Sequence, residues 1–184
     1  LPELIKYLKS LEATKSIFLV TNGQEPDMIQ KLEDEDALPT QLYLSTNAAD
    51  YQSFLKINRP RYDDSWERWN RTLTMLSTLG TRTVLRITLI RGYNVDEEMI
   101  PAFASLLQKS NVHFVEIKSY MHIGRSTNRL EHSDMLEMDE VRSFADKLVQ
   151  ENNAFTVMDE SEISRIVILQ NKKRFIDRFI PAYC

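Results

Sequence analysis

The chain has 184 residues, of which 42% are hydrophobic and 27% are charged, and its formal net charge is −4. This length can bury a substantial core, and the acidic balance excludes a generally basic nucleic-acid coat while allowing a local basic face. The single cysteine, Cys184, can form neither an intrachain disulfide nor, by itself, a zinc or iron–sulfur site. A reducing compartment fits this cysteine usage.

No apolar run is long enough to span a membrane, and no secretory signal is visible. The sequence therefore predicts a cytoplasmic protein without a membrane partner. It opens on an amphipathic helical pattern, Leu1–Leu11, with Pro2 in the first turn and no strand before it. That opening predicts a piece of a longer protein.

Short apolar runs rich in β-branched residues alternate with helical patterns along the chain. The predicted strands are Ser16–Thr21, Gln41–Thr46, Thr83–Ile90, Val112–Lys118, Phe155–Met158 and Ser164–Leu169. The predicted helices between them are Ala49–Ile57, Ser65–Leu79, Asp96–Lys109 and Leu136–Glu151. Such alternation is typical of βαβ units, so we expect an α/β fold with a parallel sheet covered by helices. Within Ser65–Leu79, Trp66 and Trp69 belong to the apolar stripe and are predicted to be core residues.

Polar residues follow the first two strands. Thr21-Asn22-Gly23 ends the first, and Ser45 and Asn47 end the second. The carboxyl ends of parallel strands meet at one edge of a sheet, where α/β proteins bind ligands. These residues can form ordinary caps and turns. The functional alternative is a hydrogen-bonding edge for a polar cofactor, with Gly23 allowing the backbone to approach it closely.

Arg86 interrupts the apolar third strand. A buried charge is costly unless it is paired, so Arg86 requires an anion on the face that it shares with Val84, Thr88 and Ile90. Two partners fit equally: a carboxylate of a ligand, or a carboxylate of the protein such as Glu116.

A basic, aromatic and polar loop follows the fourth strand. It carries Lys118, His122, Arg125 and Arg129, and Arg59-Pro60-Arg61 adds charge near the same edge. Clustered basic side chains commonly meet phosphates. The plainer alternative is solvated surface charge paired with the neighbouring acids Asp63, Asp64, Glu131 and Asp134. No Walker loop, GxGxxG, HExxH, nucleophile elbow or paired-cysteine motif is present.

The assembled segments resemble a known family, the archaeal radical S-adenosylmethionine tRNA 4-demethylwyosine synthases of wyosine biosynthesis. The likeness extends to about Leu169, and its main segments are Phe18–Gly23, Thr40–Ser45, Arg86–Asn94 and Phe114–Ser126. Further matches are Asn58-Arg59-Pro60, Ser126–Leu130 and Asp159–Arg165.

The resemblance implies a partial TIM-type parallel barrel that lacks its first two strands. Residues 1–110 would be the carboxyl-terminal part of the radical barrel, and residues 111–184 its last strands with the wyosine-forming segment. The family binds a [4Fe–4S] cluster through CxxxCxxC, cleaves S-adenosylmethionine, and joins two carbons of pyruvate to N1-methylguanosine-37 of tRNA(Phe). This chain has no CxxxCxxC. The resemblance therefore implies a carboxyl-terminal piece that holds no metal and is inactive by itself. The whole enzyme would belong to the carbon–carbon lyase class and is expected to be a monomer.

The resemblance also implies roles for individual residues. Thr21, Asn22 and Gly23 would face S-adenosylmethionine, Ser45 and Asn47 would approach its ribose or methionine part, and Arg86 would meet its carboxylate. Asn47 departs from the aspartate that is more frequent in the family. The residues expected to face tRNA are Arg59, Lys118, His122, Arg125 and Arg129. The catalytic residues stay unassigned.

Two functions of other classes fit the same sequence. One is a cluster-free TIM-barrel lyase or aldolase, with Glu116 as base and Lys118 as a Schiff-base lysine. The other is a non-catalytic α/β module that binds RNA.

Overall fold

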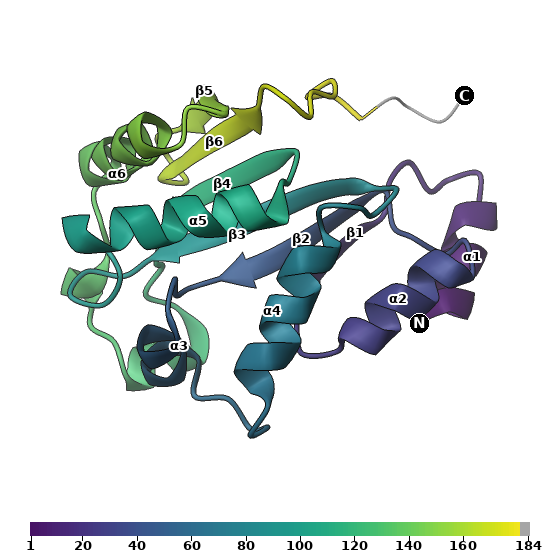
Figure 1. The fold of residues 1–184 in the computed structure, drawn as a ribbon, viewed down its shortest axis with the longest axis horizontal. Coiled ribbons are helices and arrows are strands. Elements are labelled where there is room, and N and C mark those ends of the chain that lie inside the picture. The colour runs from purple at the N-terminus through teal and green to yellow at the C-terminus, as the bar shows by residue number, and fades with distance from the viewer. Residues whose placement is uncertain (181–184) are drawn as a thin grey trace.

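A computed structural model describes residues 1–180 of the chain, and Cys184 lies outside them (Figure 1). Its strands form one sheet with the order β1-β2-β3-β4-β6-β5. The strands are β1 (Phe18–Thr21), β2 (Gln41–Thr46), β3 (Arg82–Leu89), β4 (Phe114–Ser119), β5 (Phe155–Ser161) and β6 (Ile166–Asn171). The α-helices are α1 (Pro2–Ser10), α2 (Pro26–Asp34), α3 (Tyr51–Asn58), α4 (Ser65–Met75), α5 (Ile100–Ser110) and α6 (Met138–Glu151). Single 3₁₀ turns are η1 (Glu97–Met99), η2 (Gly124–Asn128) and η3 (His132–Asp134).

The four parallel strands β1 to β4 lie side by side in chain order, which confirms the first part of the predicted sheet. The connections are helical because apolar residues recur along one face of each crossover, as Trp69 and Leu73 do in α4. Trp69 is 2% exposed, so its assignment to the core is confirmed.

The prediction of a fully parallel sheet is wrong for the last two strands. β5 and β6 form an antiparallel hairpin, and β6 runs antiparallel to β4. The physical reason is the connection, because only residues 162–165 separate β5 from β6. A parallel crossover needs a dozen residues or more.

Helices cover one face of the sheet. α2, α4, α5 and α6 pack against one another in that order and lie over the sheet in Figure 1. The strand residues beneath them are fully buried, including Leu42, Leu85, Ile87, Val115 and Leu169. Alternation along each strand sends the remaining side chains to the opposite face, which we call the bare face.

The bare face carries the charged side chains of β3 and β4 beside apolar ones such as Val84 and Phe114. Neighbouring strands align Ser45, Arg86 and Glu116 in one row across it. Val20, 49% exposed, lies on the same face at the β1 edge. Near the amino ends of the strands the carboxyl-terminal tail crosses this face, where Arg82 donates hydrogen bonds to the carbonyls of residues 177–179.

A sheet with helices on one face and polar residues on the other suits the wall of a barrel. In the described residues the sheet is open, with β1 and β5 at its edges, so the partial TIM-type barrel stays a prediction. The division at residue 110 also stays a prediction, and the sheet continues across it because β3 pairs with β4. No helix within residues 1–180 is long and apolar enough to cross a membrane.

Candidate functional site

The loops that follow the parallel strands are tied together at one end of the sheet. Asn94, which is fully buried, is the main tie. Its Nδ2 donates to the carbonyls of Asn47 and Thr88, both at 2.8 Å, and its Oδ1 accepts from the backbone N–H of Ile90 at 2.7 Å. One amide thus joins the loop after β3 to the loop after β2. The sequence signal is a single asparagine five residues beyond the end of β3, which is too common to identify this role.

Two further contacts join α3 to this end of the sheet. The ammonium of Lys56 lies over the ring of Tyr93 at 4.7 Å, and the Arg129 guanidinium donates to the carbonyl of Ile57 at 3.5 Å. The loops after β2, β3 and β4 therefore form one surface.

A cleft of about 540 Å³ opens beside β1, β2 and α3 at this end. It gathers predicted site residues from separate segments: Asn22, Ser45, Asn47 and Arg59. The other residues that line it are Gln24, Glu25, Phe54, Asn58, Pro60, Arg61, Tyr62 and Trp69. Amides, a hydroxyl, arginines and aromatic rings are the groups that bind nucleosides and their phosphates. The aromatic lining was not predicted, because the sequence marks Trp69 only as part of a buried stripe.

Thr21 and Gly23 support the cleft and are not among the residues that line it. The Thr21 hydroxyl accepts a hydrogen bond from the Gly23 N–H at 3.0 Å, which makes the tight turn that the plainer interpretation expected. Gly23 has φ of +76°, and a Cβ there would lie 2.7 Å from Leu44 Cδ1 and 3.0 Å from Trp69 Cδ1. The close approach at Gly23 is therefore to the core of the protein, and a cofactor contact from Thr21 or Gly23 stays a prediction.

Ser45 and Asn47 are held by the walls of the cleft. The Trp69 indole N–H donates to the backbone carbonyl of Ser45 at 3.1 Å. The Ser45 side chain lies on the bare face, in the same row as Arg86. The Asn47 side chain donates to Asn58 Oδ1 at 3.0 Å.

Arg86 has a protein partner on the bare face. Its Nε lies 2.8 Å from Glu116 Oε1, and the side chains of Arg86 and Glu116 are 29% and 10% exposed. The Nε–H is not directed at the carboxylate, so the contact is an ion pair, supported by a 3.4 Å hydrogen bond from Nη2 to Oε2. The guanidinium also lies over the Tyr43 ring at 4.5 Å. Of the two anions proposed for Arg86, the protein carboxylate is present, and its role toward a ligand stays a prediction.

Tyr43 completes this cluster. Burial raises the pKa of its phenol, the Glu116 carboxylate raises it further, and Arg86 opposes both. The phenol therefore stays neutral and presents a hydrogen-bonding group beside the Arg86–Glu116 pair.

Among residues 1–180, no ion pair includes Arg59, Arg61, Lys118, Arg125 or Arg129. Of the four acids proposed to neutralise them, Asp64 pairs with Arg68, Glu131 and Asp134 cap η3 reciprocally, and Asp63 forms no ion pair within residues 1–180. No carboxylate within residues 1–180 therefore forms an ion pair with these basic side chains.

His122 and Lys118 differ from the arginines in position. His122 Nδ1 lies 3.2 Å from the Tyr120 hydroxyl, and its ring meets His132 edge-on at 6.1 Å between centroids. It thus packs into the base of the loop. Lys118 lies on the bare face, two residues beyond Glu116 along β4.

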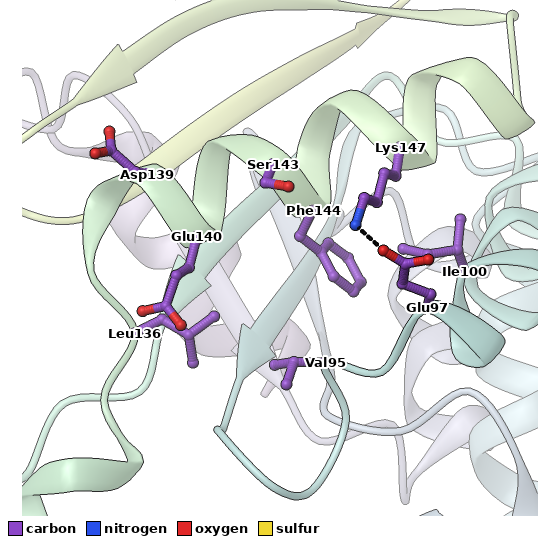
Figure 2. Close-up of a pocket in the computed structure, with 9 residues that line it drawn as sticks. All are labelled: Val95, Glu97, Ile100, Leu136, Asp139, Glu140, Ser143, Phe144 and Lys147. Atoms are coloured by element: carbon purple, nitrogen blue, oxygen red, sulfur yellow. Dashed lines mark hydrogen bonds and ion pairs between the residues drawn. The ribbon is translucent and has the colours of Figure 1, made fainter.

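A second cavity, of about 340 Å³, lies between α6 and the segment that leads into α5 (Figure 2). It contains none of the predicted site residues. Its charged groups are already paired, Lys147 with Glu97, Glu140 with Arg91, and Asp139 with Arg142. This cavity belongs to the outer helical layer and offers no free charge to a ligand.

Within the described part of the chain, no group of three or more His, Cys, Asp or Glu side chains is placed to hold a metal ion. Iron–sulfur clusters are held chiefly by cysteine thiolates. Residues 1–180 therefore do not fit such a cluster.

Comparison with known proteins gives a consistent result. Residues 109–171 match the family model described as wyosine base formation. The S-adenosyl-L-methionine-dependent tRNA 4-demethylwyosine synthase of Methanocaldococcus jannaschii is 42% identical over 177 residues, which are 96% of this chain and 53% of that protein. The Homo sapiens protein of the same name, TYW1, is 36% identical over 94% of this chain and 23% of its own length.

Solved structures agree. One described as TYW1 with a lysine–pyruvate adduct bound has a TM-score of 0.81 and 39% identity, covering 95% of this chain and 53% of that one. An archaeal TYW1 crystal structure has a TM-score of 0.74 and 35% identity, over 95% of this chain and 52% of that one. The chain thus spans about half the length of the archaeal relative and of the solved chains that it matches. With the predicted segments, the fold and these matches in agreement, the chain belongs to the tRNA 4-demethylwyosine synthase family.

Proposed function

We propose that this chain forms the part of a tRNA 4-demethylwyosine synthase that holds S-adenosylmethionine and faces tRNA. The whole enzyme would condense pyruvate carbons with N1-methylguanosine-37 of tRNA(Phe), as a cytoplasmic monomer of the carbon–carbon lyase class. A relative's structure with a lysine–pyruvate adduct supports pyruvate as the second substrate.

The observation that carries this proposal is the cleft at the carboxyl ends of the strands. It brings Asn22, Ser45, Asn47 and Arg59 together from segments that are distant in the sequence. Amide and hydroxyl groups suit the ribose and amino-acid parts of S-adenosylmethionine. Tyr62, which is 48% exposed, offers an aromatic ring to its adenine, and the buried Phe54 and Trp69 belong to the apolar wall of the cleft.

The two cofactors would be held by different parts of the whole enzyme. The [4Fe–4S] cluster, which supplies the electron for cofactor cleavage, would be held by another part of the whole enzyme. The residues of this chain would bind and orient S-adenosylmethionine, and Arg86, together with Tyr43, would face its carboxylate across the bare face. By itself the chain would be inactive.

The RNA side of the proposal rests on charge. Arg59, Arg125 and Arg129 carry no ion-pair partner within residues 1–180 and lie on one surface, although the chain as a whole is acidic. Unpaired arginines in such a position suit phosphate groups.

The alternative of a cluster-free TIM-barrel lyase or aldolase is less well supported. Its general base would be Glu116, and the structure engages that carboxylate with Arg86. Trapping with borohydride and a carbonyl substrate would detect a Schiff base at Lys118 if this alternative were correct.

Calorimetric titration of the full-length protein with S-adenosylmethionine tests the proposal. Replacing Asn47 by alanine removes a cleft amide and is expected to weaken affinity about tenfold, the value of one or two hydrogen bonds. Asn153→Ala is the matched control, since Asn153 is exposed and lines a different depression near α5 and β6. If both variants bind S-adenosylmethionine with equal affinity, the cleft is not the cofactor site. Binding of RNA without any binding of S-adenosylmethionine would favour the non-catalytic RNA-binding module.

A further inference from the structure

Two large apolar side chains stand exposed at the tip of the loop after β4. Met121 is 46% exposed and Ile123 is 64% exposed. A hydrogen bond of 2.8 Å from the Ile123 N–H to the Met121 carbonyl closes a three-residue turn around His122. This turn presents Met121 and Ile123 on either side of His122, whose ring packs back against Tyr120.

The base of the tip is buried and held by hydrogen bonds. Tyr120 is 5% exposed, and its backbone N–H donates to the Leu89 carbonyl at 2.7 Å. Its hydroxyl donates to Ser126 Oγ at 3.1 Å, and Ser126 Oγ in turn donates to the Ile123 carbonyl at 2.6 Å. These bonds hold the backbone of the tip, so the two apolar side chains are displayed by a fixed support.

Arginines follow the tip along the chain. Arg125 follows within η2, and Arg129 joins the loop to the last turn of α3, next to Arg59. None of these arginines forms an ion pair within residues 1–180. An apolar tip within an unpaired basic surface is complementary to a nucleic acid, because phosphates meet the cations and base faces meet the apolar groups.

We propose that Met121 and Ile123 form a wedge that enters between bases of a single-stranded RNA loop and helps to unstack the purine on which the enzyme acts. This inference rests on the proposed function and adds the residues that expose the substrate base. A stacked base hides its ring atoms, and extruding it costs a few kcal/mol. Apolar side chains inserted at the vacated step replace part of the lost stacking contact.

Fluorescence of 2-aminopurine, which rises when this base loses its stacking neighbours, tests the wedge. The full-length protein is titrated into an anticodon stem-loop that carries 2-aminopurine next to the target purine. The double variant Met121→Ala, Ile123→Ala should bind the RNA with a reduced fluorescence rise. We expect the ratio of unstacked to stacked RNA in the complex to fall about tenfold, because alanine removes most of the apolar contact that replaces the lost stacking.

Two controls accompany the double variant. Ile163→Ala truncates an equally apolar side chain that is 99% exposed at the β5–β6 turn, and it should leave the signal unchanged. Met121→Leu, Ile123→Leu keeps apolar bulk and should retain most of the rise. Because the replaced side chains are exposed, binding of S-adenosylmethionine should be unaffected in every variant.

Each other outcome has a defined meaning. If the wild-type protein binds and unstacks the RNA and the alanine variant does so equally, the wedge is wrong and the proposed function stands. If the variant binds more weakly but its saturated complex is as fluorescent as the wild type, the pair only adds contact area and the wedge is again wrong. If the wild-type protein does not bind the RNA, the proposed function and the wedge are both overturned.

Discussion

At the scale of single residues, the Arg86–Glu116 pair leads to a prediction about stability and to a separate one about ligand binding. Removing Arg86 leaves a carboxylate whose side chain is only 10% exposed without its counter-charge. Uncompensated buried charges are costly, so Arg86→Met should lower the free energy of unfolding by about 2–4 kcal/mol. If Arg86 also meets the cofactor, the affinity of the full-length protein for S-adenosylmethionine should fall as well.

A second substitution separates these effects. Glu116→Gln combined with Arg86→Met removes the unpaired charge and should recover most of the stability, as measured by urea unfolding. Cofactor affinity should stay low in the double variant. Affinity that is normal in both variants would assign Arg86 to the ion pair alone.

His113 predicts a dependence of stability on pH. It is 8% exposed, and its Nδ1 accepts a hydrogen bond from the Thr83 backbone N–H at 3.1 Å. Burial, followed by the charges of Arg174 and Arg82, lowers the pKa of His113 from 6.5 to about 4. Between these values the unfolded chain binds a proton that the folded chain does not, so stability falls as the pH decreases.

From pH 7 to pH 4.5 this term should cost about 2–3 kcal/mol. His113→Asn places an amide oxygen where Nδ1 accepts its bond and cannot titrate. Urea unfolding at a series of pH values should show a smaller loss for this variant than for the wild type. Parallel profiles for the two proteins would show that His113 does not titrate as described.

At the scale of elements, the turn between β1 and α2 depends on Gly23. Its φ of +76° and the closeness of Leu44 Cδ1 leave no room for a Cβ. Gly23→Ala should destabilise the protein by about 2–4 kcal/mol, combining backbone strain with overpacking. Gly80→Ala is the control, because nothing lies within 4 Å of a Cβ there and its change should stay within about 0.5 kcal/mol. Thermal unfolding of both variants compares them directly, and equal melting temperatures would contradict the packing argument.

The loop after β4 makes a prediction about salt. If Arg125 and Arg129 contact phosphates, Arg125→Ala, Arg129→Ala in the full-length protein should weaken tRNA binding. Each lost contact should also reduce the slope of log affinity against log salt by about 0.7–0.9. Filter binding at several salt concentrations measures both effects.

A matched pair of arginines elsewhere makes the salt test specific. Arg71 pairs with Asp27 and Arg142 with Glu160, so alanine at these positions should leave the slope unchanged. An unchanged slope for the loop variant would make Arg125 and Arg129 solvated surface charges.

At the scale of the whole molecule, the two edges of the sheet differ. The β5 edge carries a register shift between Val157 and Asp159 and an ion pair from Glu160 to Arg142. The β1 edge carries exposed Phe18 and Val20. Bulges and charges blunt strand pairing, whereas a flat apolar edge invites it.

We therefore expect the 184-residue chain, expressed by itself, to self-associate through β1. Val20→Lys should shift it toward the monomer in sedimentation velocity experiments. Val157→Lys, at a similarly exposed valine on β5, should have little effect. A chain that is monomeric without substitution would show that the β1 edge is already protected.

The sequence by itself determined the order of strands and helices, because periods of 2 and 3.6 in apolar residues report which face each segment buries. The first four strands and the amphipathic helices α3 to α6 follow from that local signal. The sequence also indicated a charged pair, because a lone arginine in an apolar strand, Arg86, requires an anion. Glu116 in the neighbouring strand was one of the two anions proposed.

Only the tertiary structure decided how segments distant in the sequence meet. It set the antiparallel direction of β6. It placed the Asn94 amide between the loops after β2 and β3. It also put Trp69 at the boundary between the core and the cleft. It also showed that the closeness of Leu44 requires a glycine at position 23. Asp64 pairs with Arg68, and Glu131 and Asp134 cap η3. These features depend on contacts between residues that no local pattern links, since backbone register and side-chain packing are fixed only when the whole sheet and its helices assemble.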